Sequence, residues 1–226
     1  MKDIILLHGA LGSSSELKAL KDVLDGKFSV HLLDFNGHGD NDDESIFYID
    51  GFQQDLSSLI RSKGLDRPFV FGYSMGGYVA LYHEIVEPGN LSGIITLGTK
   101  FEWNPEISEK EAGFLDPKII MEKVPEYAKY LETIHSVGWV QNVERTQKLM
   151  LKLGNEPLLR EMNLKQIKIP VTISRGNLDK MVSEKESLHI ASLIPNAEYL
   201  ELEGVKHPIR MIDPIVLKEL ILKKMK

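Results

Sequence analysis

The chain has 226 residues, of which 42% are hydrophobic and 27% are charged, and it contains no cysteine. This composition allows one compact domain with a buried core, and the lack of cysteine excludes disulfides, thiolate metal sites and cysteine nucleophiles. The formal net charge is -6, with basic residues scattered among acidic ones. Nucleic acid is therefore excluded as an expected partner, because phosphate binding requires clustered Lys and Arg.

The start of the chain offers only a short apolar run, residues 4–7, before the pair His8-Gly9. Four residues are too few for a signal-peptide core or a membrane span. We expect a cytoplasmic protein with no membrane partner, either a monomer or a small homo-oligomer. The basic residues at 223–226 close a predicted helix, whose C-terminus favours cations.

Six short apolar runs are separated by segments with helical spacing. Apolar residues run through each of them without alternating, which predicts strands buried on both faces. Helix starts are marked by Ser13 with Glu16, by Ser183 with Glu186, and by Asp213 before a proline. Alternating strands and helices predict a doubly wound α/β/α sandwich with a mostly parallel sheet. The predicted strands are residues 4–7, 28–33, 68–73, 91–97, 169–174 and 197–202.

One interval, residues 101–166, contains no good strand and is punctuated by prolines and a glycine. It predicts several short helices that form a cap, or lid, inserted into a core made of residues 1–100 and 167–226. Most of its aromatic and Met side chains are expected to pack inside the cap itself. Trp103, Tyr127 and Trp139 are the cap residues we expect at a substrate pocket.

The main chemical motif is Gly72-Tyr73-Ser74-Met75-Gly76, which follows an apolar strand and leads into a helix. This is the context of a nucleophile elbow, where a sharp turn exposes the serine and glycines avoid collisions. The turn also points free N–H groups at the start of the helix towards any oxyanion that forms there. We therefore predict Ser74 as the nucleophile and the N–H of Met75 as the first oxyanion donor.

A second tight loop, with Ala10 and Leu11 between two glycines, follows the first strand. In a sheet of order 2-1-3-4-5-6, strands 1 and 3 are neighbours at the switch point, where ligands bind at the carboxyl ends of the strands. The N–H of Ala10 is therefore predicted as the second oxyanion donor. Leu11 and Tyr73, which flank these donors, are expected at the substrate pocket.

A serine hydroxyl needs a general base, and the base needs a carboxylate to hold its tautomer. Asp179 follows the strand at 169–174, and His207 follows the strand at 197–202. Their order after Ser74 is Ser, Asp, His, the order that accompanies this type of elbow. We predict Asp179 as the acid and His207 as the base.

These motifs together resemble the α/β-hydrolase superfamily over almost the full length of the chain. The resemblance rests on His8-Gly9, Gly72-x-Ser74-x-Gly76-Gly77, Asp179, His207 and Asp34-x-x-Gly37-His38-Gly39. It implies that Asp34 and His38 belong to the scaffold and not to the catalytic machinery. Asn36 stands where the family usually has proline, and two strands that usually precede the His-Gly loop are missing here. The resemblance thus implies a trimmed fold with six parallel strands and a helical cap.

The motifs and the apolar cap predict a carboxylesterase-like enzyme that cleaves an ester bond of a small or medium, apolar-acyl substrate. Thioesterase, lactonase and carbon–carbon bond hydrolase activities are alternatives, as is a lyase similar to that of the menaquinone pathway. That lyase would need cationic anchors, for which Arg145, Arg160 and Arg210 are candidates. The alternative from another class is a small-ligand-binding receptor that keeps the triad without using it.

The remaining histidines give no metal-ligand spacing, since His83-Glu84 is not followed by the second histidine of a zinc-protease helix. No glycine loop of the phosphate-binding type is present. We expect no metal and no organic cofactor. His135, in the cap, is expected at most to touch the substrate.

Overall fold

The computed structural model describes residues 1–43, 46–136 and 138–225. One six-stranded parallel sheet organises the chain, in the order β2-β1-β3-β4-β5-β6, and confirms the predicted topology. The strands are β1 (Lys2–Leu7), β2 (Phe28–Leu33), β3 (Phe69–Tyr73), β4 (Gly93–Leu97), β5 (Val171–Gly176) and β6 (Ala197–Leu202).

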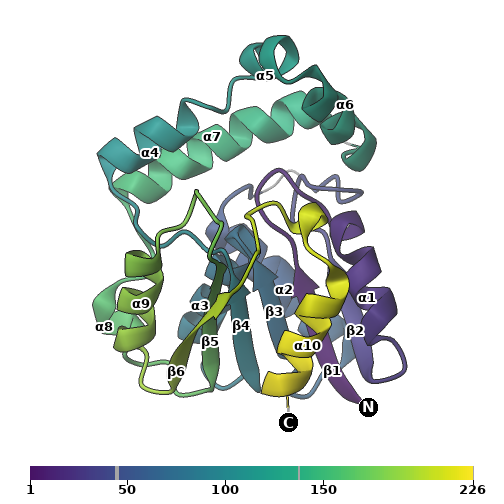
Figure 1. The fold of residues 1–226 in the computed structure, drawn as a ribbon, viewed down its shortest axis with the longest axis vertical. Helices are drawn as coiled ribbons and strands as arrows, with labels where there is room; N and C mark the ends of the chain where they lie inside the picture. Colours follow the sequence, from purple (N-terminus) through teal and green to yellow (C-terminus); the bar gives the residue numbers. More distant parts are fainter. Residues whose placement is uncertain (44–45, 137, 226) are drawn as a thin grey trace.

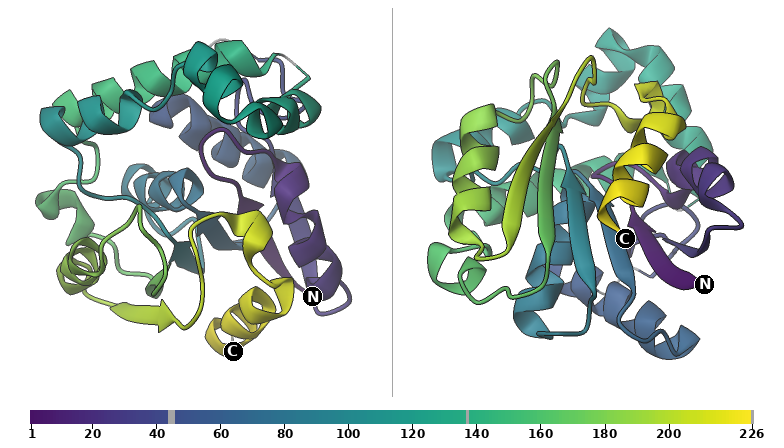
Figure 2. Two further views of the ribbon diagram at one scale, coloured as in Figure 1. Left: turned by 45° about the horizontal axis from the view of Figure 1, so that its top comes forward. Right: turned by 60° about the horizontal axis from the view of Figure 1, so that its bottom comes forward.

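Helices cover both faces of the sheet, which gives three layers (Figure 1). Along β1, successive side chains point to opposite faces, so Ile5 and Leu7 pack into one core cluster while Ile4 and Leu6 pack into the other. The first cluster lies under α2 (Ile49–Lys63), α3 (Met75–Val86) and α9 (Glu184–Leu193). The second lies under α1 (Lys18–Leu24) and α10 (Pro214–Lys224), two helices that lie side by side in both views of Figure 2.

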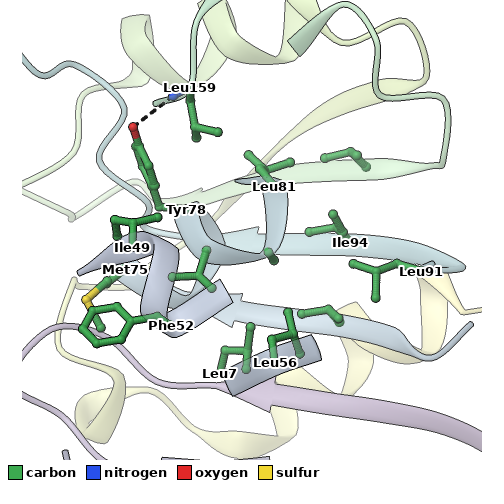
Figure 3. Close-up of a cluster of buried hydrophobic side chains, with 14 of the residues drawn as sticks. Leu7, Ile49, Phe52, Leu56, Met75, Tyr78, Leu81, Leu91, Ile94 and Leu159 are labelled. Carbon is green, nitrogen blue, oxygen red and sulfur yellow. Dashed lines mark hydrogen bonds between the residues drawn. The ribbon is translucent and has the colours of Figure 1, made fainter. Parts of the chain in front are cut away.

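The first core cluster packs helices α2 and α3 against the sheet (Figure 3). Phe52 and Leu56 of α2 and Leu81 of α3 are fully buried there. The Tyr78 hydroxyl accepts hydrogen bonds from the backbone N–H groups of Leu158 and Leu159, at 3.0 and 3.1 Å. The segment that returns from the cap is thereby fixed to the helix that follows the elbow.

Four helices lie across the end of the sheet opposite to the two chain termini (Figure 1). They are α4 (Pro105–Ala112), α5 (Pro117–Lys123), α6 (Pro125–Ile134) and α7 (Trp139–Asn155), and we call them the cap. The strands begin near the termini, so the cap faces their carboxyl ends. The fifth helix of the interval, α8 (Glu161–Leu164), packs beside α3 and α9 of the core. The interval 101–166 thus ends in a core helix.

Two details differ from the sequence-based expectations. The edge strands β2 and β6 are only half-buried, because each has a neighbour on one side only and its outer residues remain near solvent. The capping box at Ser183 and Glu186 is present, but the Ser13 hydroxyl accepts from Ser15 N–H. The Glu16 carboxylate accepts from the Tyr130 hydroxyl of the cap, at 2.7 Å, in addition to its hydrogen bond with the Ser13 backbone.

None of the helices among the described residues combines the length and the apolar composition that a membrane span requires.

Candidate active site

Ser74 lies at a strained turn between β3 and α3. Its backbone has φ 50° and ψ -116°, and the left-handed region costs a residue with a side chain roughly 1–3 kcal/mol. The turn is held by a hydrogen bond from Ser74 N–H to the Leu97 carbonyl, at 2.8 Å, and by one from the Thr99 hydroxyl to the Ser74 carbonyl, also at 2.8 Å. The geometry is that of the predicted nucleophile elbow.

The two glycines of the motif are required for different steric reasons. A Cβ at Gly72 would lie 2.5 Å from the backbone of Gly76, so the strand and the helix would collide. A Cβ at Gly76 would lie 2.6 Å from the carbonyl oxygen of Leu7, in the neighbouring strand β1. Only hydrogen fits at these positions, and the start of α3 can therefore approach β1 closely.

Asp179 and His207 lie together, as the sequence predicts. His207 Nδ1 is 2.7 Å from Asp179 Oδ2, and the other carboxylate oxygen accepts from the N–H groups of Met181 and Val182 at 2.8 and 3.1 Å. Burial opposes ionisation of Asp179, but the hydrogen bonds from His207 and the backbone outweigh it and lower the pKa of this carboxyl. An ionised Asp179 only accepts hydrogen bonds, so Nδ1 of His207 is the donor, and in the neutral imidazole Nε2 is then the acceptor.

Arg175 in β5 hydrogen-bonds to the backbone of Asp179. This side chain is 7% exposed, donates from Nη2 to the Asp179 carbonyl at 3.2 Å, and donates from Nη1 to Glu201 in β6 at 2.6 Å. The guanidinium therefore ties the loop that carries the acid to the edge strand.

Ser74, His207 and Ala10 line a cavity of about 670 Å³ under the cap. Three residues predicted at the pocket, Leu11, Tyr73 and Tyr127, also line it. Its walls are mostly apolar and include side chains from α5 and the turns on either side of it: Phe114, Leu115, Ile119, Ile120 and Val124.

A second, smaller cavity of about 60 Å³ also reaches Ser74, His207 and Ala10. The predicted pocket residue Trp103 lines this one, together with the oxyanion candidate Met75. The N–H of Met75 is at the first position of α3, where no intrahelical acceptor exists. Met150 and Met181 line both cavities; neither carries a motif that would have indicated this place.

Trp139 is a correction to the predicted pocket. It lines neither of these cavities and is buried, at 9% exposure, in the cap's own cluster with Leu131 and Val143. Trp139 begins α7 and packs in a cluster that includes Ile120 of α5 and Leu131 of α6. Trp139 therefore packs inside the cap itself, as was expected for most aromatic residues of the cap.

The larger cavity has Glu16 and Arg210 in its wall, and Tyr130 lies beside both of them. The guanidinium of Arg210 lies 4.7 Å from the ring centroid of Tyr130 and 5.5 Å from that of Tyr127. Desolvation raises the pKa of Glu16, against the hydrogen bond from Tyr130. Of the three candidate cationic anchors, Arg210 alone lines the cavity, while Arg145 lies over the ring of Phe47 and Arg160 donates to the Pro157 carbonyl.

His135, expected from the sequence at most to touch the substrate, lines neither cavity. Its imidazole is buried between the cap and two core loops. Asp34 and His38 hold the core loop at 34–41: Asp34 accepts from Ser14 N–H at 2.6 Å, and His38 Nδ1 donates to the Asn36 carbonyl at 3.0 Å. The described part of the chain contains no cluster of three or more His, Asp or Glu side chains that would hold a metal ion.

A three-layer parallel sandwich with a serine elbow, an Asp–His pair and a covering cap defines the α/β-hydrolase class. Residues 3–131 match the family model described as alpha/beta hydrolase fold. The chain therefore belongs to the α/β-hydrolase family, as the resemblance predicted.

Individual relatives differ in what they share with the chain. A 2-succinyl-6-hydroxy-2,4-cyclohexadiene-1-carboxylate synthase of Serratia proteamaculans is 32% identical over 96 residues, which are 42% of this chain and 37% of that protein. The chain thus spans less than half the length of that synthase. A pimeloyl-[acyl-carrier protein] methyl ester esterase of Yersinia pseudotuberculosis is 23% identical over 97% of this chain and 92% of its own length. NosK from Streptomyces actuosus shares the fold, with a TM-score of 0.83, 18% identity and coverage of 98% and 96%.

Proposed function

We propose that the chain is a serine hydrolase that cleaves an ester-type bond through a Ser74–His207–Asp179 triad. The observation that carries the proposal is the meeting of the strained Ser74 elbow and the Asp179-supported His207 at the wall of one mostly apolar cavity. The family and its esterase-named relative support the same chemistry. A structural role alone requires neither the strain at Ser74 nor the opening onto a cavity.

The reaction follows from these positions. Nε2 of His207 takes the proton of the Ser74 hydroxyl, and Ser74 Oγ forms a bond to the ester carbonyl carbon. The N–H groups of Met75 and Ala10 donate to the oxyanion of the tetrahedral intermediate. The bond to the alkoxy oxygen then breaks, and His207 returns the proton to the leaving alcohol. Water, activated by His207, attacks the acyl-enzyme in the same way and releases the acid and the free serine.

The two cavities at Ser74 differ in volume, and this difference supports a proposal for the substrate class. A space of about 60 Å³ holds a few heavy atoms, since one water occupies about 30 Å³ of liquid. A space of about 670 Å³ lies within the range of ligand pockets for whole small molecules. We place a medium apolar acyl chain in the larger cavity and a short alcohol in the smaller one.

Two reciprocal series of esters test this assignment. Methyl esters of acids from two to twelve carbons should be hydrolysed with a maximum at medium chain length, whereas acetates of alcohols of the same lengths should decline steeply beyond two or three carbons. The Ser74→Ala variant should hydrolyse neither series. Equal rates for bulky groups on both sides of the ester would contradict the assignment, and full activity of the variant would contradict the mechanism.

A second candidate function is a lyase on an anionic substrate, with the triad as a base. Arg210 at the larger cavity and the synthase-named relative favour it, whereas the Glu16 carboxylate in the same wall opposes it. Replacing Arg210 by Met separates the two candidates. An esterase for neutral apolar esters keeps its kcat/KM within about threefold, while a lyase that anchors an anion through a bidentate contact loses a factor of about 10 to 100.

A further inference from the structure

His135 lies at the end of α6, where the cap meets two loops of the core. It is 4% exposed. Its Nε2 is 2.9 Å from the carbonyl oxygen of Leu11, and the N–H of Gly39 donates to its Nδ1 at 3.0 Å. One cap side chain thus bridges the loop that carries Ala10 and the loop at 37–39.

The bridge requires one tautomer of His135. A backbone N–H only donates, so Nδ1 must be unprotonated to accept from Gly39, and Nε2 carries the proton that is donated to Leu11. Burial lowers the pKa of His135, partly offset by the bond to Leu11 and by Asp34, and favours the neutral form that this geometry needs. His38 is the other ring that faces it, with centroids 5.9 Å apart.

The loop that accepts this hydrogen bond is itself strained. Leu11 has φ 58°, in the left-handed region, which costs a residue with a Cβ about 1–2 kcal/mol. Its side chain is buried in the cap cluster beside Leu131 and Trp139. Leu11 is therefore held by the cap through both its carbonyl and its side chain.

On the core side, the same loop is held at the Gly9 carbonyl. His8 Nδ1 lies 2.8 Å from this oxygen, and Gly12 N–H donates to it at 3.1 Å. In a trans peptide the C=O of Gly9 and the N–H of Ala10 point in opposite directions. Fixing the Gly9 carbonyl therefore aims the Ala10 N–H, and Leu11 is the next residue in the chain.

We propose that His135 is a positioning residue for the oxyanion hole, supplied by the cap. It acts through Leu11: the cap holds the strained loop, and the loop aims the Ala10 N–H at the oxyanion. The inference rests on the proposed function, in which Ala10 is an oxyanion donor. The rate of the chemical step then depends on the contact between His135 of the cap and Leu11, although His135 touches no substrate.

The cap also provides a matched control. Asn142, 3% exposed, donates from Nδ2 to the Gly37 carbonyl at 2.7 Å, so it fastens α7 to the loop at 37–39 without contacting the loop at 9–12. Replacing either residue by Leu removes one buried polar side chain between cap and core. Only the change at His135 removes a contact to Leu11.

The test compares His135→Leu, His135→Gln and Asn142→Leu with the wild-type chain on a methyl ester of medium length. His135→Leu should lower kcat about 30-fold, less than the ~10²–10³ of a deleted oxyanion donor, with KM within about twofold. His135→Gln, whose amide can still donate to the Leu11 carbonyl, should return to within about threefold of wild type. Asn142→Leu should stay within about threefold.

Amide hydrogen exchange supplies a readout independent of catalysis. Exchange of the Gly12 amide should accelerate in His135→Leu and remain unchanged in Asn142→Leu. An unchanged kcat in a folded His135→Leu protein, or equal losses in both Leu variants, would overturn the proposal. If the wild-type chain hydrolyses no ester, the proposed function fails, and unchanged exchange at Gly12 would then overturn the positioning role separately.

Discussion

Two loops deliver N–H groups to the proposed oxyanion, and they are held in place by different means. The elbow at Ser74 is fixed entirely within the core: two glycines allow the close approach of strand and helix, and the Leu97 and Thr99 contacts come from the end of the neighbouring strand β4. The loop with Ala10 is fixed from two sides: by His8 of the core, which contacts the adjacent Gly9, and by His135 of the cap, which lies 124 residues from its partner Leu11. Substitutions at the elbow should therefore have the same effect whether or not the cap contacts are intact. Substitutions that remove a cap contact should instead disturb the loop with Ala10.

The largest effect is expected at the acid. Asp179→Asn keeps the shape of the side chain but lets His207 adopt the wrong tautomer, so kcat should fall about 10⁴-fold. Steady-state kinetics on a methyl ester measure it. Asp213→Asn is the matched control, because Asn caps the start of α10 as well as Asp does, and its kcat should be unchanged. A loss below tenfold in Asp179→Asn would exclude the acid assignment.

Gly76→Ala tests whether the elbow is fixed by the core alone. The added Cβ meets the backbone of β1 at Leu7 and His8, which cannot move without disturbing the sheet, so the free energy of unfolding should fall by about 3 kcal/mol. Urea unfolding measures this change. The loss should be the same whether or not His135 is also replaced, because the elbow does not depend on the cap. Strong coupling between the two substitutions would contradict this difference between the loops.

Acid should weaken the histidine contacts that hold the Ala10 loop before it weakens the elbow. Burial lowers the pKa of His8 from 6.5 to about 4, against the bond to Gly9 and the charge of Asp34, and burial also lowers the pKa of His38 and His135. Between pH 4 and pH 6.5 the His8 imidazole is protonated in the unfolded chain but neutral in the folded one. The free energy of unfolding therefore rises with pH over this range. On going from pH 7 to pH 5, the lowered pKa of His8 alone should reduce the free energy of unfolding by about 2 kcal/mol. Urea midpoints at the two pH values measure the loss, and equal midpoints would argue against buried neutral histidines.

The smallest effect is expected for Tyr130→Phe. The hydroxyl donates to Glu16 at 2.7 Å and joins α6 to the short helix Ser14–Leu17 that follows the Ala10 loop. Its removal should lower stability by about 1 kcal/mol and leave kcat within about twofold. Thermal unfolding and steady-state kinetics separate these effects. A drop in kcat as large as that of His135→Leu would show that any cap contact supports the oxyanion loop.

The core of this fold could be predicted from sequence because its signals are local. The strands have continuous apolar runs, Gly72 and Gly76 flank Ser74, and Asp179 and His207 each follow a strand in the expected order. Parallel strands bring such positions to one edge of the sheet, so the order along the chain already implies their meeting.

The cap could not be predicted in the same detail, since its contacts join residues that are distant in sequence. Nothing near Trp139 indicates that its ring faces other cap helices and not the substrate. His135 has no motif, and its role depends on the carbonyl of Leu11 and the N–H of Gly39, groups that every residue type provides. Glu16 was assigned to a capping box by spacing and does hydrogen-bond to the Ser13 backbone, but its second partner, the Tyr130 hydroxyl of the cap, has no signal in the sequence.

The most direct test of the central claim is to treat the wild-type chain with a fluorophosphonate and locate the adduct by tandem mass spectrometry. A serine activated by His207 at the elbow should carry the label stoichiometrically on Ser74, and the Ser74→Ala and His207→Ala variants should not be labelled. An unlabelled wild-type chain that still hydrolyses esters, or a label on another residue, would contradict the account.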